Sequence, residues 1–218
     1  MLSKIKTMAL EGLNGYLVEI QSDISGGLPS FDVVGLPDIR VKEAKERVKA
    51  AIRNSGIEFP SRKIVVNLAP ADKKKEGTFF DLPIAIGILF AIEEINKLAL
   101  LNIEDTIFLG ELSLDGKIAK VNGILPMCIE AKKLGIKRVV VPIQNIVEAS
   151  IIKDLDVIAV SSLKEVLDFI MGNIKIEKEN VNEMAHLKKI DYYNLDFSEV
   201  KGQENAKRAL EIAAARLT

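Results

Sequence analysis

The chain has 218 residues, 48% of them apolar, and a formal net charge of −1 from 30 basic and 31 acidic side chains. This length and apolar content are enough for the core of one large folded domain. The near-neutral balance excludes a nucleic-acid or membrane partner held by bulk charge, so any such role must depend on a local patch. A single cysteine, Cys128, rules out an internal disulfide.

Neither the N-terminal segment nor any apolar run indicates a membrane or secreted protein. The opening MLSKIKTMALEG lacks the continuous apolar region of a signal peptide. The longest apolar run, LPIAIGILFAI, stops at Glu93 and is shorter than the roughly 20 residues that span a bilayer. We therefore expect a cytoplasmic protein with no membrane partner, in which this run is a core helix.

Three strand-like runs open the chain, at residues 4–10, 15–24 and 30–36, with glycine-rich turns between them. This succession favours an antiparallel meander. From Asp38 the apolar period becomes helical, with Asp38 as the N-cap and Gly56 as the stop signal.

The next elements are a buried strand and an apolar helix. Residues 63–70 read KIVVNLAP and predict the strand. Residues 81–96 predict the helix, and Pro83 suits its first turn.

The second half alternates between strands and helices. Residues 107–121 predict two strands joined by a hairpin through Asp115 and Gly116. A helix, a strand, a short helix, a strand and a helix then follow, over residues 124–135, 137–142, 143–150, 156–161 and 162–171. This irregular order predicts an α+β fold, a mixed sheet with packed helices and a small βαβ-like element near its end.

The chain changes character after Gly172. Residues 173–195 have few apolar positions and no clear period, so we expect a domain over residues 1–172 and an exposed linker after it. Residues 196–218 contain a predicted helix after Gly202. Its apolar stripe has no partner left in the sequence, so we expect the chain to stop inside a second domain; the stripe is Ala206, Leu210, Ala213 and Leu217.

Local charge is concentrated between Arg40 and Lys75, where eleven basic and four acidic residues give an excess of seven. Such a run is often only a solvated face. The functional alternative is weak, sequence-independent contact with DNA phosphates. The candidate residues for this contact are Arg40, Arg47, Arg62, Lys63, Lys73, Lys74 and Lys75. Phe59, Phe79 and Phe80 are nearby but are expected in the core.

We expect no metal site. His186 is the only histidine and lies in the predicted linker, without a cluster of ligands at metal spacing. Cys128 falls on an apolar helix face, where a small buried hydrophobe is the simplest interpretation.

Four blocks of sequence together resemble one known family. They are GLPSFDVVGLPD, RVKAAIRNSGIEFP, VNLAPADKKKEGTFFDLPIAIGIL and GELSLDGKIAKVNGILP, within residues 28–126. In this order they resemble the N-terminal domain of the ComM/YifB family, also described as magnesium-chelatase-related proteins. The tail DFSEVKGQENAKRALEIAAA resembles the start of that family's AAA+ ATPase domain.

This resemblance implies both a fold and a function. The fold implied for residues 1–172 is that of Lon-type proteases, within the ribosomal-protein superfamily. The function implied is a role in an AAA+ motor that migrates DNA branches in recombination and natural transformation. Such motors are homo-oligomers, hexameric rings that use ATP and magnesium in the full-length protein.

The resemblance also implies a lost active site. EGTFFD lies where Lon-type peptidases have DGPSAG, so Phe79 takes the position of the serine nucleophile. VNGILPM lies where the catalytic lysine would be, which places Leu125, Pro126 and Met127 there. These side chains cannot form a serine–lysine pair. We therefore expect no catalytic residue, with Phe79 and Phe80 packed into the former cleft.

In the tail, the resemblance places Val200, Gly202 and Gln203 beside the adenine of ATP in a full-length protein. The sequence contains no GxxxxGK[ST], so nothing in this chain holds triphosphate and magnesium, and it needs no cofactor of its own.

The leading hypothesis is thus a non-catalytic module of a DNA branch-migration motor. Two alternatives stay open. One is a residual peptidase that uses Thr78 or Ser113, although residues 121–131 contain no lysine to serve as the base. The other is a chelatase-like AAA+ chaperone that acts in metal insertion.

Overall fold

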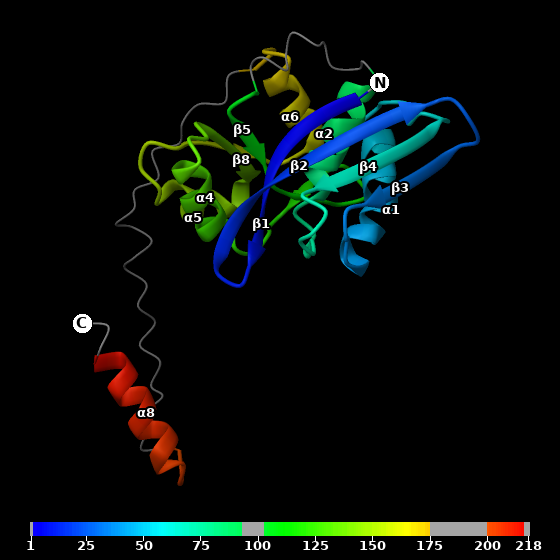
Figure 1. Cartoon of the computed structure of the whole chain (residues 1–218). Helices are drawn as coiled ribbons and strands as arrows, with labels where there is room; N and C mark the ends of the chain where they lie inside the picture. The colour runs from blue at the N-terminus through cyan, green and yellow to red at the C-terminus, as the bar shows by residue number, and fades with distance from the viewer. Residues whose placement is uncertain (1, 93–102, 175–199, 216–218) are drawn as a thin grey trace. The chain divides into compact units, whose positions relative to one another are not determined.

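The computed structural model describes residues 2–92, 103–174 and 200–215 (Figure 1). The chain divides into two compact units, residues 1–181 and residues 182–218. Apart from its first two positions, the expected linker over residues 173–195 lies outside the described residues, and so does His186 within it.

The first sheet of the larger unit has four strands in the order β1-β2-β4-β3. The strands and the helices that pack on them are β1 (Leu2–Glu11), β2 (Asn14–Ser25), β3 (Ser30–Val34), β4 (Lys63–Ala69), α1 (Ile39–Asn54) and α2 (Asp81–Ala91). Strands β1, β2 and β4 are antiparallel neighbours, whereas β3 runs parallel to β4. Both helices lie behind the sheet as Figure 1 shows it.

The expected antiparallel meander is therefore wrong for its third strand. After β3 the chain turns into α1 and returns as β4, because a parallel pair needs a crossover connection of this kind. Gly35 begins the turn with φ of +96°, and a Cβ atom there would lie 2.3 Å from the carbonyl oxygen of Leu68. Only glycine permits this close approach.

The core lies between the sheet and α2. Alternate residues of β4, Ile64, Val66 and Leu68, are buried, as expected for a strand with one face toward the core. Every residue of α2 is buried, which confirms the expected core helix over its described part; residues 93–96 lie outside the described residues. The Ser3 hydroxyl donates to the carbonyl oxygen of Gly87 at 2.6 Å, so α2 lies directly on β1.

The second half contains a parallel three-stranded sheet in the order β5-β8-β9, a two-stranded hairpin and further helices. These elements are β5 (Thr106–Phe108), β6 (Glu111–Leu112), β7 (Ile118–Ala119), α4 (Ile124–Lys133), β8 (Arg138–Pro142), η1 (Ile143–Asn145), α5 (Ile146–Ser150), β9 (Asp156–Val160) and α6 (Leu163–Ile170). The predicted βαβ-like element and the five predicted elements from residue 124 onward are confirmed.

The predicted strand pair over residues 107–121 is only partly right. Its first residues belong to β5, which is buried throughout and pairs in parallel with β8. Parallel strands are usually covered on both faces, which explains a short strand without polar alternation. Only β6 and β7 form the hairpin, and Gly116 in their turn has φ of +82°.

Local capping signals were read correctly. The Asp38 carboxylate accepts a hydrogen bond of 2.8 Å from the Val41 backbone N–H at the start of α1. Gly56 follows the last turn with φ of +86°.

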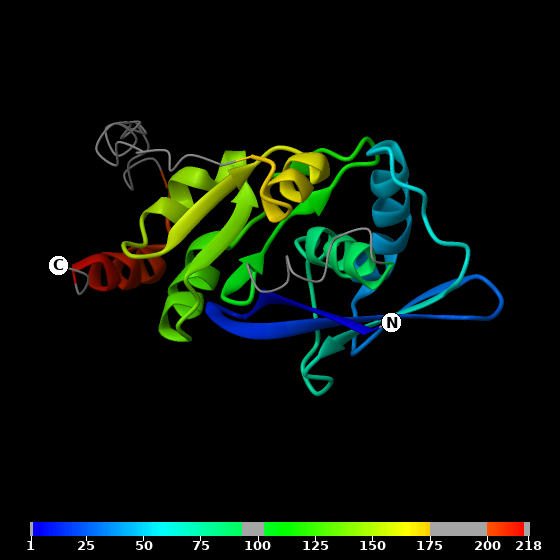
Figure 2. The same cartoon turned by 90° about the horizontal axis from the view of Figure 1, so that it is seen from above.

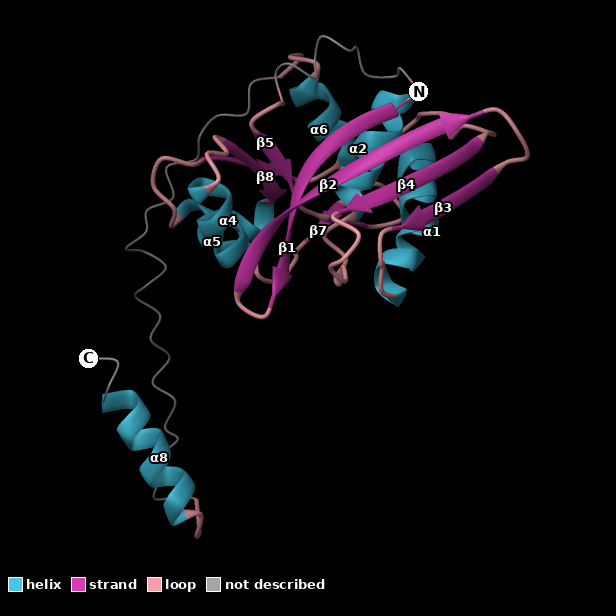
Figure 3. Cartoon of the chain, viewed as in Figure 1, coloured by secondary structure: helices cyan, strands magenta, loops and turns pink. Residues whose placement is uncertain are grey.

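Seen from above, the second half in green and yellow lies beside the first half in blue and cyan, and β1 contacts β5 where they meet (Figure 2). Figure 3 shows the resulting mixture of sheets and packed helices, which confirms the mixed α/β class.

The smaller unit contains the helix α8 (Glu204–Ala215), at the position predicted after Gly202. Its side chains are mostly exposed, including that of Leu210 on the predicted apolar stripe. Leu217 lies outside the described residues. Among the helices that the structure describes, none is long and apolar enough to cross a membrane.

Candidate functional site

The junction between the 70–80 loop and α2 is closed by two aromatic rings. Phe79 is 6% exposed and Phe80 is fully buried, and their ring centroids lie 4.6 Å apart. Phe59 is buried as well. The expectation that all three belong to the core is confirmed.

The backbone at this junction is fixed against the segment after β5. Gly110 donates its N–H to the carbonyl oxygen of Phe79 at 3.1 Å, and Leu82 donates to the carbonyl oxygen of Gly110 at 3.0 Å. These two bonds fix the backbone on either side of Phe80 and Asp81 against the Gly110 segment. The fully buried Phe80 ring has no exposed surface for a substrate to contact.

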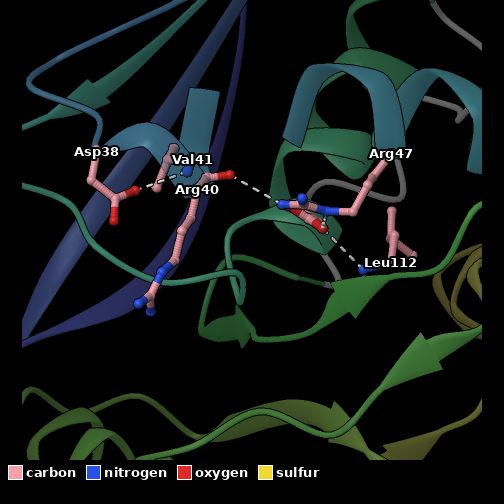
Figure 4. A network of polar contacts seen from close by, with 6 residues as sticks. Asp38, Arg40, Val41, Arg47 and Leu112 are labelled. Carbon is pink, nitrogen blue, oxygen red and sulfur yellow. Dashed lines mark hydrogen bonds and ion pairs between the residues drawn. The ribbon is translucent and has the colours of Figure 1, made fainter. Parts of the chain in front are cut away.

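An ion pair lies directly behind the rings, between Arg47 of α1 and Asp81 of α2. Arg47 Nε lies 2.6 Å from Asp81 Oδ2, and Nη2 donates to Oδ1 at 3.0 Å. Leu112 of β6 donates its backbone N–H to Oδ2 at 3.2 Å. In Figure 4 the Arg47 side chain and the Leu112 backbone point toward the same carboxylate, that of Asp81. Arg47 also donates to the carbonyl oxygen of Arg40 at 3.1 Å. The pair therefore joins α1, α2 and β6.

Burial dominates the electrostatics of this pair. It raises the pKa of the Asp81 carboxyl to about 6, although the hydrogen bond from Arg47 and the N–H of Leu112 oppose the rise. The same hydrogen bond raises the pKa of the Arg47 guanidinium. Both carboxylate oxygens of Asp81 accept hydrogen bonds from Arg47 or Leu112, and the side chain is fully buried. The carboxylate therefore links structural elements and is not exposed to act as a base on a substrate.

The structure offers no support for a residual peptidase. Several Ser and Thr hydroxyls donate to backbone carbonyls or to a carboxylate, whereas the buried Ser22 and Thr106 hydroxyls have no partner in the part of the chain that the structure describes. Within the described residues, no Ser or Thr hydroxyl is hydrogen-bonded to a lysine or histidine side chain. The segment expected to replace the lysine is fixed by other groups: the Val121 N–H donates to Asn145 Oδ1, and the Leu125 N–H donates to Glu148 Oε1. Thr78 and Ser113 have no base in this hydrogen-bond network.

The described residues bear on the metal and cysteine expectations. No group of three or more His, Cys, Asp or Glu residues that could hold a metal ion occurs within residues 2–92, 103–174 and 200–215. Cys128 is buried in α4, and this burial raises the pKa of its thiol to about 12. It is a small core residue, as expected.

Two of the seven expected DNA contacts are occupied inside the protein. Arg47 is bound to Asp81 as described above. Lys75 is fully buried, and its ammonium donates to the carbonyl oxygens of Pro70 and Lys73. Burial lowers the pKa of this ammonium. Neither side chain is presented to a ligand at the surface, which corrects the expectation that the whole set lies on one exposed face.

The lysines beside Lys75 are already paired with carboxylates. Lys73 Nζ lies 2.8 Å from Glu11 Oε2 and 4.5 Å from the centroid of the Tyr16 ring. Lys74 Nζ lies 2.6 Å from Glu76 Oε1, and both of these side chains are exposed. These pairs remove much of the local positive charge at this end of β4.

The remaining candidates do not share one location. Arg40 is exposed in the first turn of α1, whose start is held against the 70–80 loop by the bond from the Asp38 N–H to the Lys75 carbonyl oxygen. Arg62 and Lys63 lie at the other end of β4. A strand of this length spans roughly 20 Å. The expected single patch is thus divided between the two ends of the β3–α1–β4 unit.

Sequence reasoning missed a cavity of about 240 Å³ at the second of these ends. We call it the basic pocket. Four basic side chains line it: Lys45, Lys49, Arg53 and Arg62. Three of them follow one another at every fourth position of α1, a spacing that places them on one face of a helix and that could have indicated the pocket.

The expected adenine contacts lie in the smaller unit. Val200 is 45% exposed, Gly202 has φ of +74°, and the carbonyl oxygen of Gln203 accepts from the Lys207 N–H at the start of α8. This segment begins a helix, and a nucleotide contact by it stays a prediction.

Comparison with known proteins gives a consistent set of relatives. Residues 20–145, more than half of the chain, match the family model described as subunit ChlI of Mg-chelatase. The chain is 39% identical to the competence protein ComM of Haemophilus influenzae, over 98% of this chain and 42% of that protein. It is also 39% identical to YifB of Escherichia coli, over 98% of this chain and 41% of that protein.

A more distant relative is a protease. Lon protease 2 of Bacillus subtilis is 31% identical over 64% of this chain and 26% of the protease. The chain thus spans less than half the length of each of these relatives.

Proposed function

The chain belongs to the family of the ChlI subunit of Mg-chelatase, with ComM and YifB among its relatives, and from this we propose that it is a non-catalytic, DNA-holding module of an AAA+ motor. In this proposal residues 1–172 form a domain with the fold of Lon-type proteases, of the ribosomal-protein superfamily. Residues 173–195 connect it to an ATPase domain that begins at residues 196–218.

The observation that carries the proposal is the closed junction, by which we mean Phe79, Phe80, Asp81 and Arg47. The similarity to Lon protease 2 supports descent from a peptidase-type domain. In the alignment that the sequence motifs suggest, Phe79 lies at the position of the nucleophile, and it is buried. A hydroxyl and a neutral amine are both needed there for peptide hydrolysis. A domain that has filled this site with apolar rings serves binding or assembly.

The DNA part of the proposal is supported by surface charge and by a relative's name. ComM is a competence protein. Of the seven expected contacts, Arg40, Arg62, Lys63, Lys73 and Lys74 keep exposed or half-exposed side chains. They supply sequence-independent phosphate contacts while the motor, a hexameric ring in the full-length protein, uses ATP and magnesium to migrate DNA branches in recombination and natural transformation.

The test measures the ATPase rate of the full-length protein, including its ATPase domain, with four-way junction DNA and with linear duplex of the same composition. The proposal predicts stronger stimulation by the junction. Replacing Arg62 and Lys63 with glutamate should reduce the stimulation, whereas the same change at Lys132 and Lys133 of α4 should leave it unchanged.

Two results would count against the proposal. Equal stimulation of the ATPase rate by junction and linear DNA would contradict the proposed role in branch migration. An ATPase rate that does not change when DNA is added would favour the second candidate, a chelatase-like chaperone ATPase. The description of the matching family, subunit ChlI of Mg-chelatase, supports this candidate.

A further inference from the structure

The basic pocket lies between the last turns of α1 and the start of β4. Figure 2 shows the cyan connection that leaves α1 and returns to the sheet at this place. Of the charged residues that line the cavity, Lys45, Lys49, Arg53 and Arg62 are basic and only Glu46 is acidic, an excess of three positive charges. A hollow with such a lining attracts anions.

These four cations differ from those at the closed junction in having no internal partner. Within the part of the chain that the structure describes, none of the four side chains forms an ion pair or a hydrogen bond. By contrast, Arg47 on another face of α1 is bound to Asp81, and Lys73 of the 70–80 loop is paired with Glu11. Like charges around one cavity repel one another, and an anion bound between them would offset this repulsion.

The frame of the pocket is rigid. Phe59 is buried beneath it, and its ring centroid lies 5.9 Å from that of Phe31. The N–H of Ser30 donates to the carbonyl oxygen of Arg62, which fixes the backbone that carries this guanidinium. Two of the lining lysines, Lys45 and Lys49, are half-buried along the helix.

The size of the cavity limits what it can hold. Its volume of about 240 Å³ is below the roughly 300–1,000 Å³ that is typical of pockets for whole small-molecule ligands. A single tetrahedral oxyanion with its bound water is a better match than a complete nucleotide. Because Phe59 is only 7% exposed, its ring is not available for stacking on a base.

A purely structural explanation covers only one of the four residues. Arg53 lies in the last turn of α1, where a positive side chain interacts favourably with the helix dipole. Lys45 and Lys49 lie in the middle of the helix and Arg62 lies beyond it, so the dipole does not account for them.

We propose that the basic pocket binds one phosphate group, with Arg53 and Arg62 as hydrogen-bonding guanidinium groups and Lys45 and Lys49 as point charges. The phosphate comes either from a nucleic-acid backbone or from a free polyphosphate. This assignment goes beyond the proposed function because three of the four residues were outside the expected DNA-contact set. It concerns a defined pocket rather than a diffuse basic face.

The experiment compares variants of the whole chain in two binding assays at low salt: fluorescence anisotropy with a short labelled duplex, and calorimetric titration with tripolyphosphate. Lys49→Glu and Arg53→Glu should each weaken binding about tenfold, the usual order for a lost charged hydrogen bond. Lys42→Glu is the matched control, since Lys42 is exposed on the same helix, outside the pocket, and undergoes the same charge change. It should change binding by no more than about twofold.

A fourth variant keeps the test independent of folding defects. Glu46→Gln removes the only carboxylate of the pocket and should strengthen binding about threefold, a gain that misfolding cannot produce. Circular dichroism of each variant checks that the fold is intact.

The two assays separate the sources of the phosphate. Duplex binding that depends on Lys49 and Arg53 and is displaced by tripolyphosphate identifies a nucleic-acid backbone. Tripolyphosphate binding without duplex binding keeps the pocket, assigns it to a free polyphosphate and removes the DNA contact from the proposed function.

Other outcomes would refute phosphate binding by the basic pocket. Duplex binding that persists equally in all variants leaves the proposed function in place and refutes the pocket. Equal losses in Lys42→Glu and Lys49→Glu would show a diffuse basic face, and no binding of either probe would show no phosphate site at all.

Discussion

The closed junction and the basic pocket use different faces of α1, and their charged side chains are paired in the junction but not in the pocket. At the junction, the buried carboxylate of Asp81 is paired with the guanidinium of Arg47 and accepts from Leu112. The rings of Phe79 and Phe80 pack against each other beside this pair. In the pocket, cations from the same helix face a cavity with only Glu46 as a lining acid. Groups that are satisfied internally contribute to stability, and groups left unsatisfied at a surface are available to a ligand. The difference indicates that the junction serves the core, and under the proposed function a ligand has to bind elsewhere.

The largest expected effect is at the ring that fills the junction. Phe80→Ala should lower the free energy of unfolding by about 3–5 kcal/mol, because it leaves a cavity beneath α2. Phe31→Ala, at the half-buried ring beside the pocket, should cost clearly less. Urea denaturation of both variants measures the difference. A loss below about 1 kcal/mol for Phe80→Ala would mean that the ring is dispensable and that the junction is not closed.

The ion pair of the junction gives the next effect. Arg47→Ala should cost about 3 kcal/mol at pH 8, because Asp81 is then buried without its partner. Below pH 5 the cost should shrink, since a protonated Asp81 carries no charge to compensate. Arg53→Ala, at a pocket residue of the same helix, should stay within about 0.5 kcal/mol. Equal costs for the two arginines would contradict the contrast between the junction and the pocket.

Asp81 also makes a prediction for the unaltered protein. Its pKa is about 6 in the folded chain against 3.8 for the free group, so between these values the folded state retains a proton that the unfolded state releases. Stability from this group is therefore complete below about pH 4 and is lost as the pH rises through about 6, by roughly 2–3 kcal/mol. Asp81→Asn should lack this dependence. Identical pH profiles of the two proteins, measured by denaturation, would show that Asp81 is not perturbed.

The smallest effect concerns the paired lysines of the 70–80 loop. If three or four phosphates are contacted, the logarithm of DNA affinity should fall with the logarithm of salt concentration at a slope of about −3 to −4. Replacing Lys73 and Lys74 with glutamate should flatten this slope by less than about two, because Glu11 and Glu76 already offset part of their charge. A complete loss of salt dependence would place the main contact here instead of in the pocket.

Local signals in the sequence predicted much of the fold. The helical period after Asp38, the apolar run that follows Asp81 in α2 and the alternation of strands and helices after residue 124 each depend on neighbours along the chain. The pairing of β3 with β4 could not be predicted in this way, because it depends on the crossover through α1. The sequence likewise predicted β5 as part of the hairpin, because its parallel pairing with β8 involves residues far apart along the chain.

The site was predictable only where burial followed from side-chain type. Phe79 and Phe80 were expected in the core and lie there. Asp81 was missed because its partner is 34 positions away along the chain. Lys75 was placed on the surface because nothing in a run of three lysines indicates that the third folds inward onto two carbonyl groups.

The most direct test of the account is an NMR titration of the isotope-labelled chain with short duplex DNA at low salt. The account predicts that backbone amide signals of the pocket residues Lys45, Lys49, Arg53 and Arg62 shift in a saturable way. Signals of residues 78–82 at the closed junction should stay in place. Shifts centred on residues 78–82, with residues 45–62 unmoved, would contradict the account, because the position described as closed would then be the one that binds.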